Sequence, residues 1–297
     1  MAERAWAEAG AGRTGPAARF PGRPGAYLEQ ARESVRVYRL VVAMWVRSTM
    51  AYRTSFVLTA VGNFAGTGLD FVTIMLMFSH IRVLGGFSLP EVAFLYGATS
   101  TAFGVADLVM GSMDRLGRRV RDGTLDVLLL RPAPVLAQVA ADRFALRRLG
   151  RVTQGAVVFG WALTRVDVHW TLVKVLMVPM MLVSGAVIFS AVYVAAGAFQ
   201  FYAGDAAEVA NSFTYGGNTL LQYPPAIFAR DLVRGVTFVV PLAFVNWLPA
   251  LHVLGEPDPL GLPAWVDFGS PVIAVACCAL AGLAWRAGLR TYRSTGS

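Results

Sequence analysis

Six apolar stretches constrain this chain more than any other feature of its sequence. A helix of about 20 apolar residues crosses the hydrocarbon core of a bilayer. The six candidate stretches are 55–79, 90–111, 149–165, 172–196, 232–253 and 269–288. The third is short, and Pro241 and Pro249 interrupt the fifth, for which we consider both a full span and a re-entrant half-helix. Because backbone groups in lipid must be hydrogen-bonded within the chain, the sequence predicts an all-α integral membrane protein with six transmembrane helices.

The charged residues support this prediction and orient it. Only 15% of the residues are charged, against about 25% in a soluble domain. Of the 26 basic residues, 23 are predicted on one side, Arg230 and Arg234 among them, and only Arg82, Arg165 and Lys174 on the other. The positive-inside rule then places both termini in the cytoplasm and the protein in the cell (plasma) membrane. The same rule accounts for the net charge of +8 without a nucleic-acid partner, and the arginine-rich composition suggests a bacterial source.

The chain before the first stretch divides into two parts. Residues 1–26 are rich in Gly, Pro, Ala and Arg and are predicted to be a disordered cytoplasmic tail. Residues 27–54 repeat apolar and aromatic residues at spacings of three and four, which indicates a helix with one apolar stripe. Arginines beside Tyr38 and Trp45 favour an interfacial helix among lipid headgroups over one packed on a soluble domain. Residues 55–293 are then the six-span domain.

The sequence lacks the motifs of an enzyme. A phosphate-binding loop ends in Gly-Lys-Ser/Thr, and the only lysine, Lys174, lies in "TLVKVLM" inside a span. His80, His169 and His252 have no metal-motif spacing to another ligand, and no GxSxG occurs. We therefore expect no catalytic residue, no metal site and no cofactor in this chain. If ATP drives the protein, a partner binds ATP and magnesium.

Polar residues inside the apolar stretches are the candidate pathway residues. Asn63, Thr67 and Asp70 recur at helical spacing in the first stretch, beside a pair of small residues, Gly62 and Gly66. A carboxylate at the bilayer centre costs about 2.5–3.5 kcal/mol on insertion scales, so Asp70 needs a reason to be there. It lines a pathway or a protomer interface, or it is polar glue within the bundle.

Two further residues are placed with this candidate set. Asp107 lies on a second polar face near the cytoplasmic end of the second stretch, where we expect it to pair with a neighbouring arginine. Asn246 is a polar residue within the interrupted fifth stretch. Both are predicted at a pathway or protomer interface.

The densest basic cluster lies between the second and third stretches, in "RRVRDGTLDVLLLRPAP". Asp114 to Arg121 can form two helical turns, and Gly123 can end them because glycine tolerates the left-handed cap conformation. This predicts a short basic helix within a cytoplasmic loop, 112–148. The alternative is a solvated loop that only obeys the positive-inside rule.

Two segments carry a resemblance to a known family. "DGTLDVLLLRPAP" and "QYPPAIFARDLVRGVTFVVPLAFVNWLPA" resemble the ABC-2-type permeases, and the chain is similar over about 30–293 to the bacterial six-span permeases encoded in pairs beside one ATPase. The resemblance implies the permease subunit of an ATP-binding cassette (ABC) exporter. Its partners would be an ABC-type ATPase subunit, a second ABC-2-type permease subunit and membrane lipids, and its substrate a drug, antibiotic or lipid.

The resemblance also implies where the ATPase docks, on a coupling helix between the second and third spans. Arginines would meet an acidic rim on the ATPase, and Met113, Leu116 and Val120 would enter its apolar groove. The implied coupling residues are Met113, Asp114, Arg115, Leu116, Arg118, Arg119, Val120, Arg121, Asp122 and Gly123.

The alternative functions are an ion- or proton-coupled carrier that uses Asp70 and a membrane-embedded enzyme.

Overall fold

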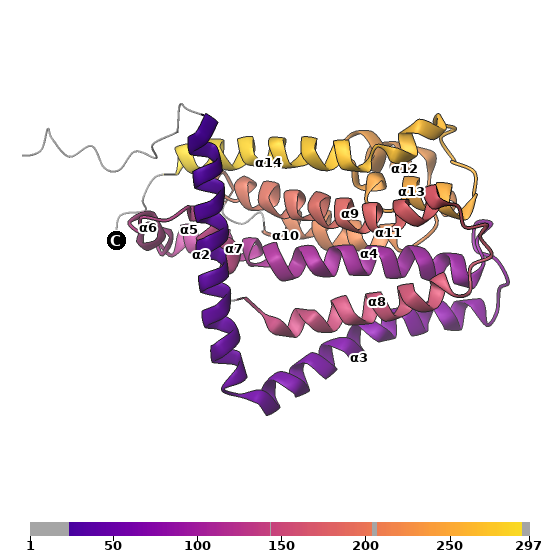
Figure 1. Ribbon diagram of the computed structural model, residues 1–297, viewed down its shortest axis with the longest axis horizontal. Helices are drawn as coiled ribbons and strands as arrows, with labels where there is room; N and C mark the ends of the chain where they lie inside the picture. Colours follow the sequence, from indigo (N-terminus) through magenta and orange to yellow (C-terminus); the bar gives the residue numbers. More distant parts are fainter. Residues whose placement is uncertain (1–23, 143, 204–206, 293–297) are drawn as a thin grey trace, which may run out of the picture.

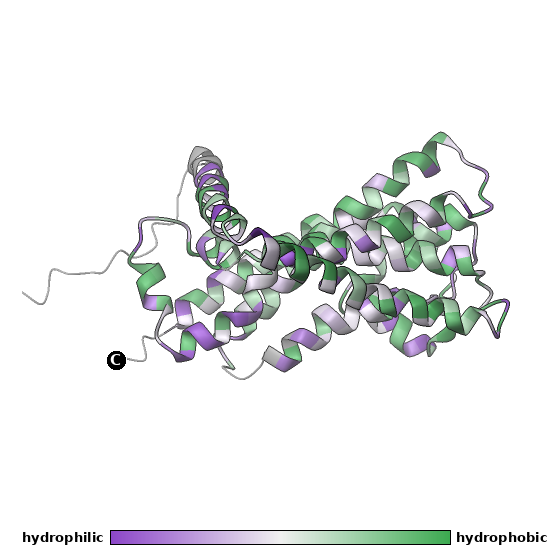
Figure 2. Ribbon diagram, turned by 90° about the horizontal axis from the view of Figure 1, so that it is seen from below, coloured by the Kyte–Doolittle hydropathy of each residue, from purple (hydrophilic) through white to green (hydrophobic). Residues whose placement is uncertain are grey.

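Four long helices form the body of the molecule. The computed structural model describes residues 24–142, 144–203 and 207–292, and these ranges contain helices and no strand. By length and composition, four of the described helices can cross a bilayer. Figure 2 shows the hydrophobic residues that cover them. The four helices are α3 (Arg53–Phe78), α4 (Leu89–Met110), α9 (Leu172–Phe199) and α14 (Ser270–Thr291) (Figure 1). These helices match the first, second, fourth and sixth predicted stretches to within about a turn.

The two ends of the bundle carry different short elements (Figure 1). We call one the loop end, where α2 (Pro24–Met50), α5 (Leu116–Arg121), α6 (Leu125–Leu129) and α7 (Val135–Ala141) lie. We call the other the far end, where α12 (Arg230–Phe238), α13 (Trp247–Leu254) and the short helix η6 (Ala264–Phe268) lie.

Two shorter helical segments return the chain between the long helices. Because α4, α9 and α14 all run from the far end to the loop end, the chain must come back twice (Figure 1). The first return is α8 (Leu149–Leu163), close to the predicted third stretch. The second is 207–221, a helix whose middle turn is π-helical, made of α10 (Ala207–Asn211), η3 (Ser212–Gly216) and α11 (Gly217–Leu221).

Of the two alternatives for the fifth stretch, 232–253, the structure contradicts the single full-length span. The chain there forms α12 and α13, two helices of 9 and 8 residues, separated by a turn with Pro241 and the short helix η5 (Leu242–Phe244). Pro241 cannot donate a backbone hydrogen bond, so the helix ends before it. Both helices stay at the far end (Figure 1). Arg230 and Arg234 therefore lie at the far end, opposite the loop to which the prediction assigned them.

Asn246 shows why this segment stays folded against the bundle. Its side chain is fully buried, and its amide nitrogen lies 2.9 Å from the carbonyl of Leu95, 2.7 Å from the hydroxyl of Thr99 and 3.2 Å from the carbonyl of Leu221. An amide in this position ties the far-end segment to α4 and α11. Asn246 is thus an internal polar contact of this chain, and its placement at a pathway or protomer interface stays a prediction.

Burial differs sharply between neighbouring helices. The apolar part of α4 is 78% buried, because glycines let α8 approach it closely: a Cβ at Gly97 would lie 2.5 Å from the backbone nitrogen of Phe159, and one at Gly155 2.8 Å from that of Thr101. In α3 the corresponding share is 6%. Helix α3 therefore contributes an almost complete face that no described part of this chain covers.

Helix α2 crosses the loop end at a steep angle to the bundle (Figure 1). It packs against α7, and the Tyr38 hydroxyl donates to the carbonyl of Val109 at 3.1 Å. It begins at Pro24, three residues before the predicted start, and the rest of the predicted tail lies outside the described residues.

Candidate functional site

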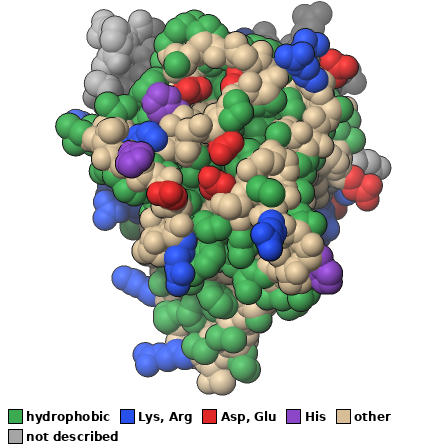
Figure 3. Space-filling view, turned by 90° about the vertical axis from the view of Figure 1, so that its right-hand side faces the viewer, with side chains coloured by type: hydrophobic (Ala, Val, Ile, Leu, Met, Phe, Trp, Pro, Cys, Tyr) green, Lys and Arg blue, Asp and Glu red, His purple; other side chains and the backbone are tan. Residues whose placement is uncertain are grey.

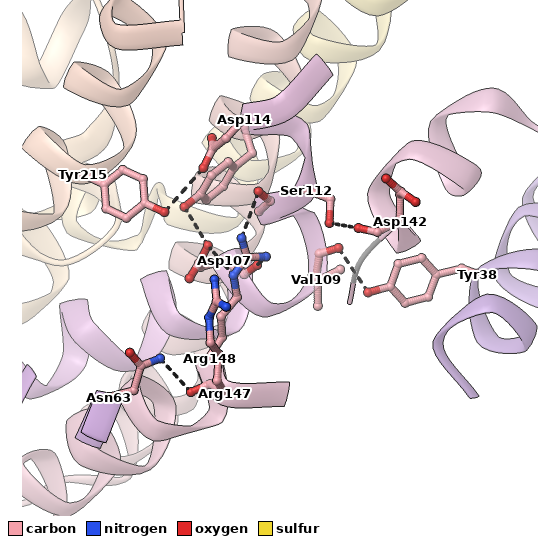
Figure 4. Close-up of polar contacts among 12 residues, drawn as sticks. Tyr38, Asn63, Asp107, Val109, Ser112, Asp114, Asp142, Arg147, Arg148 and Tyr215 are labelled. Atoms are coloured by element: carbon pink, nitrogen blue, oxygen red, sulfur yellow. Dashed lines mark hydrogen bonds and ion pairs between the residues drawn. The ribbon is translucent and has the colours of Figure 1, made fainter. Parts of the chain in front are cut away.

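A buried ion pair joins α4 to the start of α8 at the loop end. Asp107 is 4% exposed, and its Oδ1 lies 3.3 Å from Nε of Arg148. Arg148 also donates to the carbonyls of Asp107 and Gly111, at 2.9 and 3.1 Å, and the Tyr193 hydroxyl of α9 donates to Asp107 at 3.2 Å (Figure 4). The predicted pairing of Asp107 with an arginine is confirmed. Its placement at a pathway or protomer interface stays a prediction, and within this chain the pair is internal.

The chain after α4 is fastened to α9 and not held away from the bundle. Helix α4 continues through η1 (Gly111–Arg115) into α5. Gln200, buried at the end of α9, accepts from the backbone nitrogen of Gly117 at 2.6 Å and donates to the carbonyl of Met113 at 3.3 Å. The Tyr215 hydroxyl of η3 donates to Asp114 at 3.4 Å (Figure 4). These bonds clamp the predicted coupling helix onto two passes of the bundle.

This clamp corrects the predicted docking face. Met113 and Leu116 are 0% exposed, and both pack against Gly197, where a Cβ would lie 3.4 Å from Sδ of Met113. Val120 is partly buried. The prediction that Met113 and Leu116 enter the groove of a partner is therefore wrong for this arrangement. Their apolar side chains hold α5 to α9 instead.

Apart from Asp114, which accepts from Tyr215, the charged members of the predicted coupling set lie in two groups. Arg119 pairs with Asp142, whose carbonyl also accepts from Ser112, so this arginine holds the loop together. The other group is exposed at the surface of the loop end and consists of Arg115, Arg118, Arg121 and Asp122. Gly123 has a φ of +65°, as the predicted helix end requires.

Exposed apolar side chains lie further along the same loop, on α6. Leu125 and Leu128 are buried, whereas Val127 is 56% and Leu130 80% exposed. Asp126 accepts from the hydroxyl of Tyr292, which follows α14, at 2.9 Å. Burial and this contact with Asp126 raise the pKa of Tyr292 to about 12, so the phenol keeps its proton at neutral pH. The sequence analysis did not predict that α6 presents an exposed apolar surface, although its leucines stand in the quoted segment "DGTLDVLLLRPAP".

The polar stripe of α3 is open except where Asn63 bonds to Arg147 and where the carbonyl of Thr67 accepts from the hydroxyl of Tyr96 at 2.9 Å. Asn63 donates to the carbonyl of Arg147 at 2.9 Å, and the Thr67 hydroxyl bonds to the carbonyl of Asn63 in its own helix. Asp70 is exposed and forms no hydrogen bond or ion pair with the described residues. Added Cβ atoms at Gly62 and Gly66 would meet nothing within 4 Å. Polar glue within this chain therefore does not explain Asp70.

The far end carries acidic side chains, gathered over the upper part of the face in Figure 3. Asp258 accepts from the backbone nitrogens of Leu260 and Leu262, and Asp267 lies 3.1 Å from Nδ1 of His252. Burial raises the pKa of Asp267. These carboxylates are engaged in loop geometry, and the described residues contain no cluster that could hold a metal ion.

Comparison with known families decides the class of the protein. The sequence profile of the ABC-2 family transporter protein matches residues 64–296. The chain belongs to the ABC-2 family of transporters. No curated protein and no solved structure matches it significantly. The match confirms the resemblance of the two sequence segments, and it identifies a membrane transport component rather than a catalytic subunit. For a transporter of this family, the uncovered face of α3 and the exposed side chains of the loop end are the two surfaces whose roles need an explanation.

Proposed function

We propose that this ABC-2 chain is the permease subunit of an ABC exporter in a bacterial cell membrane. A second permease, identical or different, would complete the pathway, and a separate ATPase that binds ATP and magnesium would drive it. The substrate would be an amphipathic or hydrophobic molecule such as a drug, antibiotic or lipid. The loop end and both termini would be cytoplasmic, since most basic residues still lie there after Arg230 and Arg234 are moved to the far end.

The exposed face of α3 supports the proposal of a second permease subunit. An uncovered carboxylate and hydroxyls facing acyl chains are unfavourable, and small residues let helices of two chains approach closely. Asp70, Gly62 and Gly66 combine these features on one helix that is 6% buried. A partner helix over this face would remove Asp70 from lipid and line a polar pathway with Asn63 and Thr67.

The exposed part of α6 carries the proposal of an ATPase partner, and it is the observation on which the exporter function rests. Val127 and Leu130 form an apolar tip that the loop end holds out from the bundle, and the exposed Arg118 would meet an acidic rim on the ATPase. Apolar residues that fill a pocket supply most of an interface's affinity, and charges mainly steer docking. We therefore move the apolar contact from Met113 and Leu116 to Val127 and Leu130.

The contacts behind α6 suggest how its motion would reach the bundle. Gln138 of α7 donates to the carbonyl of Leu128 at 3.2 Å, and Asp126 is bonded to Tyr292 after α14. Gln200 fastens α5 to α9. When nucleotide closes two ATPase subunits, a displaced α6 would pull on these long helices together. Alternating access of a cavity between two permeases would follow.

Capture of the ATPase tests this proposal. Leu130→Asp, alone and with Val127→Asp, should leave the permease folded because both side chains are exposed, but should abolish co-purification of the ATPase encoded beside it. Val239→Asp is the matched control: Val239 is equally exposed, 79%, but lies at the far end. Wild-type capture by both α6 variants would refute α6 as the docking tip, and failure of the wild-type chain to capture any ABC-type ATPase would refute the exporter function.

A further inference from the structure

A cationic side chain at the loop end has no counter-ion among the residues that the structure describes. Arg151 lies in the first turn of α8, and its Nη1 is buried without a hydrogen-bond partner. The guanidinium forms no hydrogen bond or ion pair with the residues that the structure describes. A guanidinium offers five donors and stays charged at any physiological pH. A charge in this state within a membrane protein marks a functional site by default.

The direction of the side chain excludes the simplest explanation. Long arginines near helix ends usually extend to water at the membrane surface. On α8, however, Thr153 and Gly160 occupy the exposed side, whereas Arg151 shares the side of the buried Gly155 and Val158. Arg151 therefore points inward, toward α4 and the 207–221 pass.

Two aromatic rings hold the guanidinium there. Its Cζ lies 5.1 Å from the ring centroid of Phe103 and 5.7 Å from that of Tyr215. Cation–π contacts of this kind attract the charge but leave the N–H donors unused. The rings thus orient the guanidinium without satisfying it.

Two carboxylates at the loop end, Asp107 and Asp114, are already engaged. Asp107 is paired with Arg148, and Asp114 accepts from the Tyr215 hydroxyl and forms no ion pair with Arg151. A partly buried cation with free donors is stabilised most by an anion that brings its own acceptors. We propose that Arg151 binds the anionic headgroup, a phosphate or carboxylate, of the amphiphile that this protein transports, with Phe103 and Tyr215 flanking it. This inference rests on the proposed export function and names its substrate class.

Equilibrium binding tests the site without ATP or ATPase. The full chain in phosphatidylcholine nanodiscs is titrated with radiolabelled dodecyl phosphate. Unlabelled dodecyl phosphate, dodecyl maltoside, dodecyltrimethylammonium and inorganic phosphate compete for it. We expect dodecyl phosphate to compete best, because among these compounds only it carries both a negatively charged headgroup and the apolar tail. Arg151→Gln should weaken its binding roughly 10-fold to 100-fold, the range for a lost hydrogen bond to a charged group.

Two variants separate this site from general effects of charge and folding. Arg147→Gln removes an exposed arginine one turn away and should bind dodecyl phosphate like the wild type. Arg151→Lys keeps the charge but loses the planar fork, so it should bind more weakly while still preferring the phosphate to the maltoside. If Arg151→Gln fails to fold, Arg151→Lys tests the site in its place.

Four results would overturn the inference. They are wild-type binding by Arg151→Gln, equal losses in Arg147→Gln and Arg151→Gln, equal competition by dodecyl maltoside, and competition by inorganic phosphate as strong as that by dodecyl phosphate. The last would indicate a site for a free ion rather than a headgroup. None of these depends on the ATPase, so a chain that binds dodecyl phosphate through Arg151 but captures no ATPase would refute the exporter function alone.

Discussion

Single polar residues in this protein have opposite roles according to what surrounds them. Asp107 is buried and bonded to Arg148 and Tyr193, so it stabilises the junction of three passes. Asp70 is exposed on α3 and forms no hydrogen bond or ion pair with the residues that the structure describes. Asp107 belongs to a structural ion pair. Asp70 belongs to a surface that, in our proposal, a second permease covers.

The ion pair makes a prediction about stability. Arg148→Gln should lower the free energy of unfolding by about 3–5 kcal/mol, because it leaves the carboxylate of Asp107 buried without its counter-charge. Adding Asp107→Asn should recover much of this loss, since no charge then remains. Thermal unfolding of the purified variants in detergent measures both effects. Losses that simply add in the double variant would show that the two side chains do not interact.

Asp70 makes a prediction about assembly. Asp70→Asn keeps the size and removes the charge, so the chain should insert normally while the fraction of permease dimers, measured by light scattering in detergent, changes. Thr73→Val is the control, because the hydroxyl of Thr73 only bonds to Leu69 in its own turn, at 3.0 Å. Unchanged dimerisation in Asp70→Asn would leave the α3 face without a role in pairing.

At the scale of elements, the loop end is a rigid platform with an exposed tip. The buried side of the loop, with Leu116 and Leu125, packs into the bundle, and polar bonds from Gln200 and Gln138 fix its backbone. The exposed side presents Val127 and Leu130. A short α6 of five residues would not persist alone, so its shape depends on this support.

This division predicts opposite outcomes for two similar substitutions. Leu116→Asp places a carboxylate in a fully buried apolar site, and a loss of several kcal/mol of stability should reduce the folded yield. Leu130→Asp should leave the yield unchanged because the side chain is 80% exposed. Fluorescence-detected size-exclusion chromatography compares the two. Equal yields would mean that α5 does not pack on α9 as described.

The whole molecule combines four described helices that are long and apolar enough to cross a bilayer with a helical cap at the far end. The shorter segments α8 and 207–221 return the chain between the long helices. The segment 222–268 then closes the far end without crossing, anchored by Asn246 and by Lys174, whose Nζ donates to the carbonyl of Val253 at 2.8 Å.

This topology predicts which side of the membrane each loop faces. In a chain with Cys277 and Cys278 replaced by serine, a membrane-impermeant maleimide should label Arg234→Cys from outside intact cells. It should label Thr124→Cys, at the loop end, only after the cells are opened. Both positions are exposed in the structure. Labelling of Arg234→Cys only in opened cells would restore the fifth span originally predicted from the sequence.

By itself the sequence determined those features of this protein that depend on local residue pattern. Apolar length located α3, α4, α9 and α14, because crossing lipid is a local requirement that each segment meets alone. The special conformation of Gly123 followed from its residue type. The ABC-2 family was visible in two segments for the same reason, since local patterns carry it.

Only the tertiary structure decided the roles of residues whose neighbours are distant in the chain. The segment 232–253 is as apolar as a span, yet Asn246 finds buried partners on α4 and α11 and keeps it at the far end. Met113 and Leu116 have the spacing of a docking face, yet Gly197, some 80 residues away in the sequence, leaves room for them inside. A hydrophobic pattern specifies that a face is covered, but packing between segments determines what covers it.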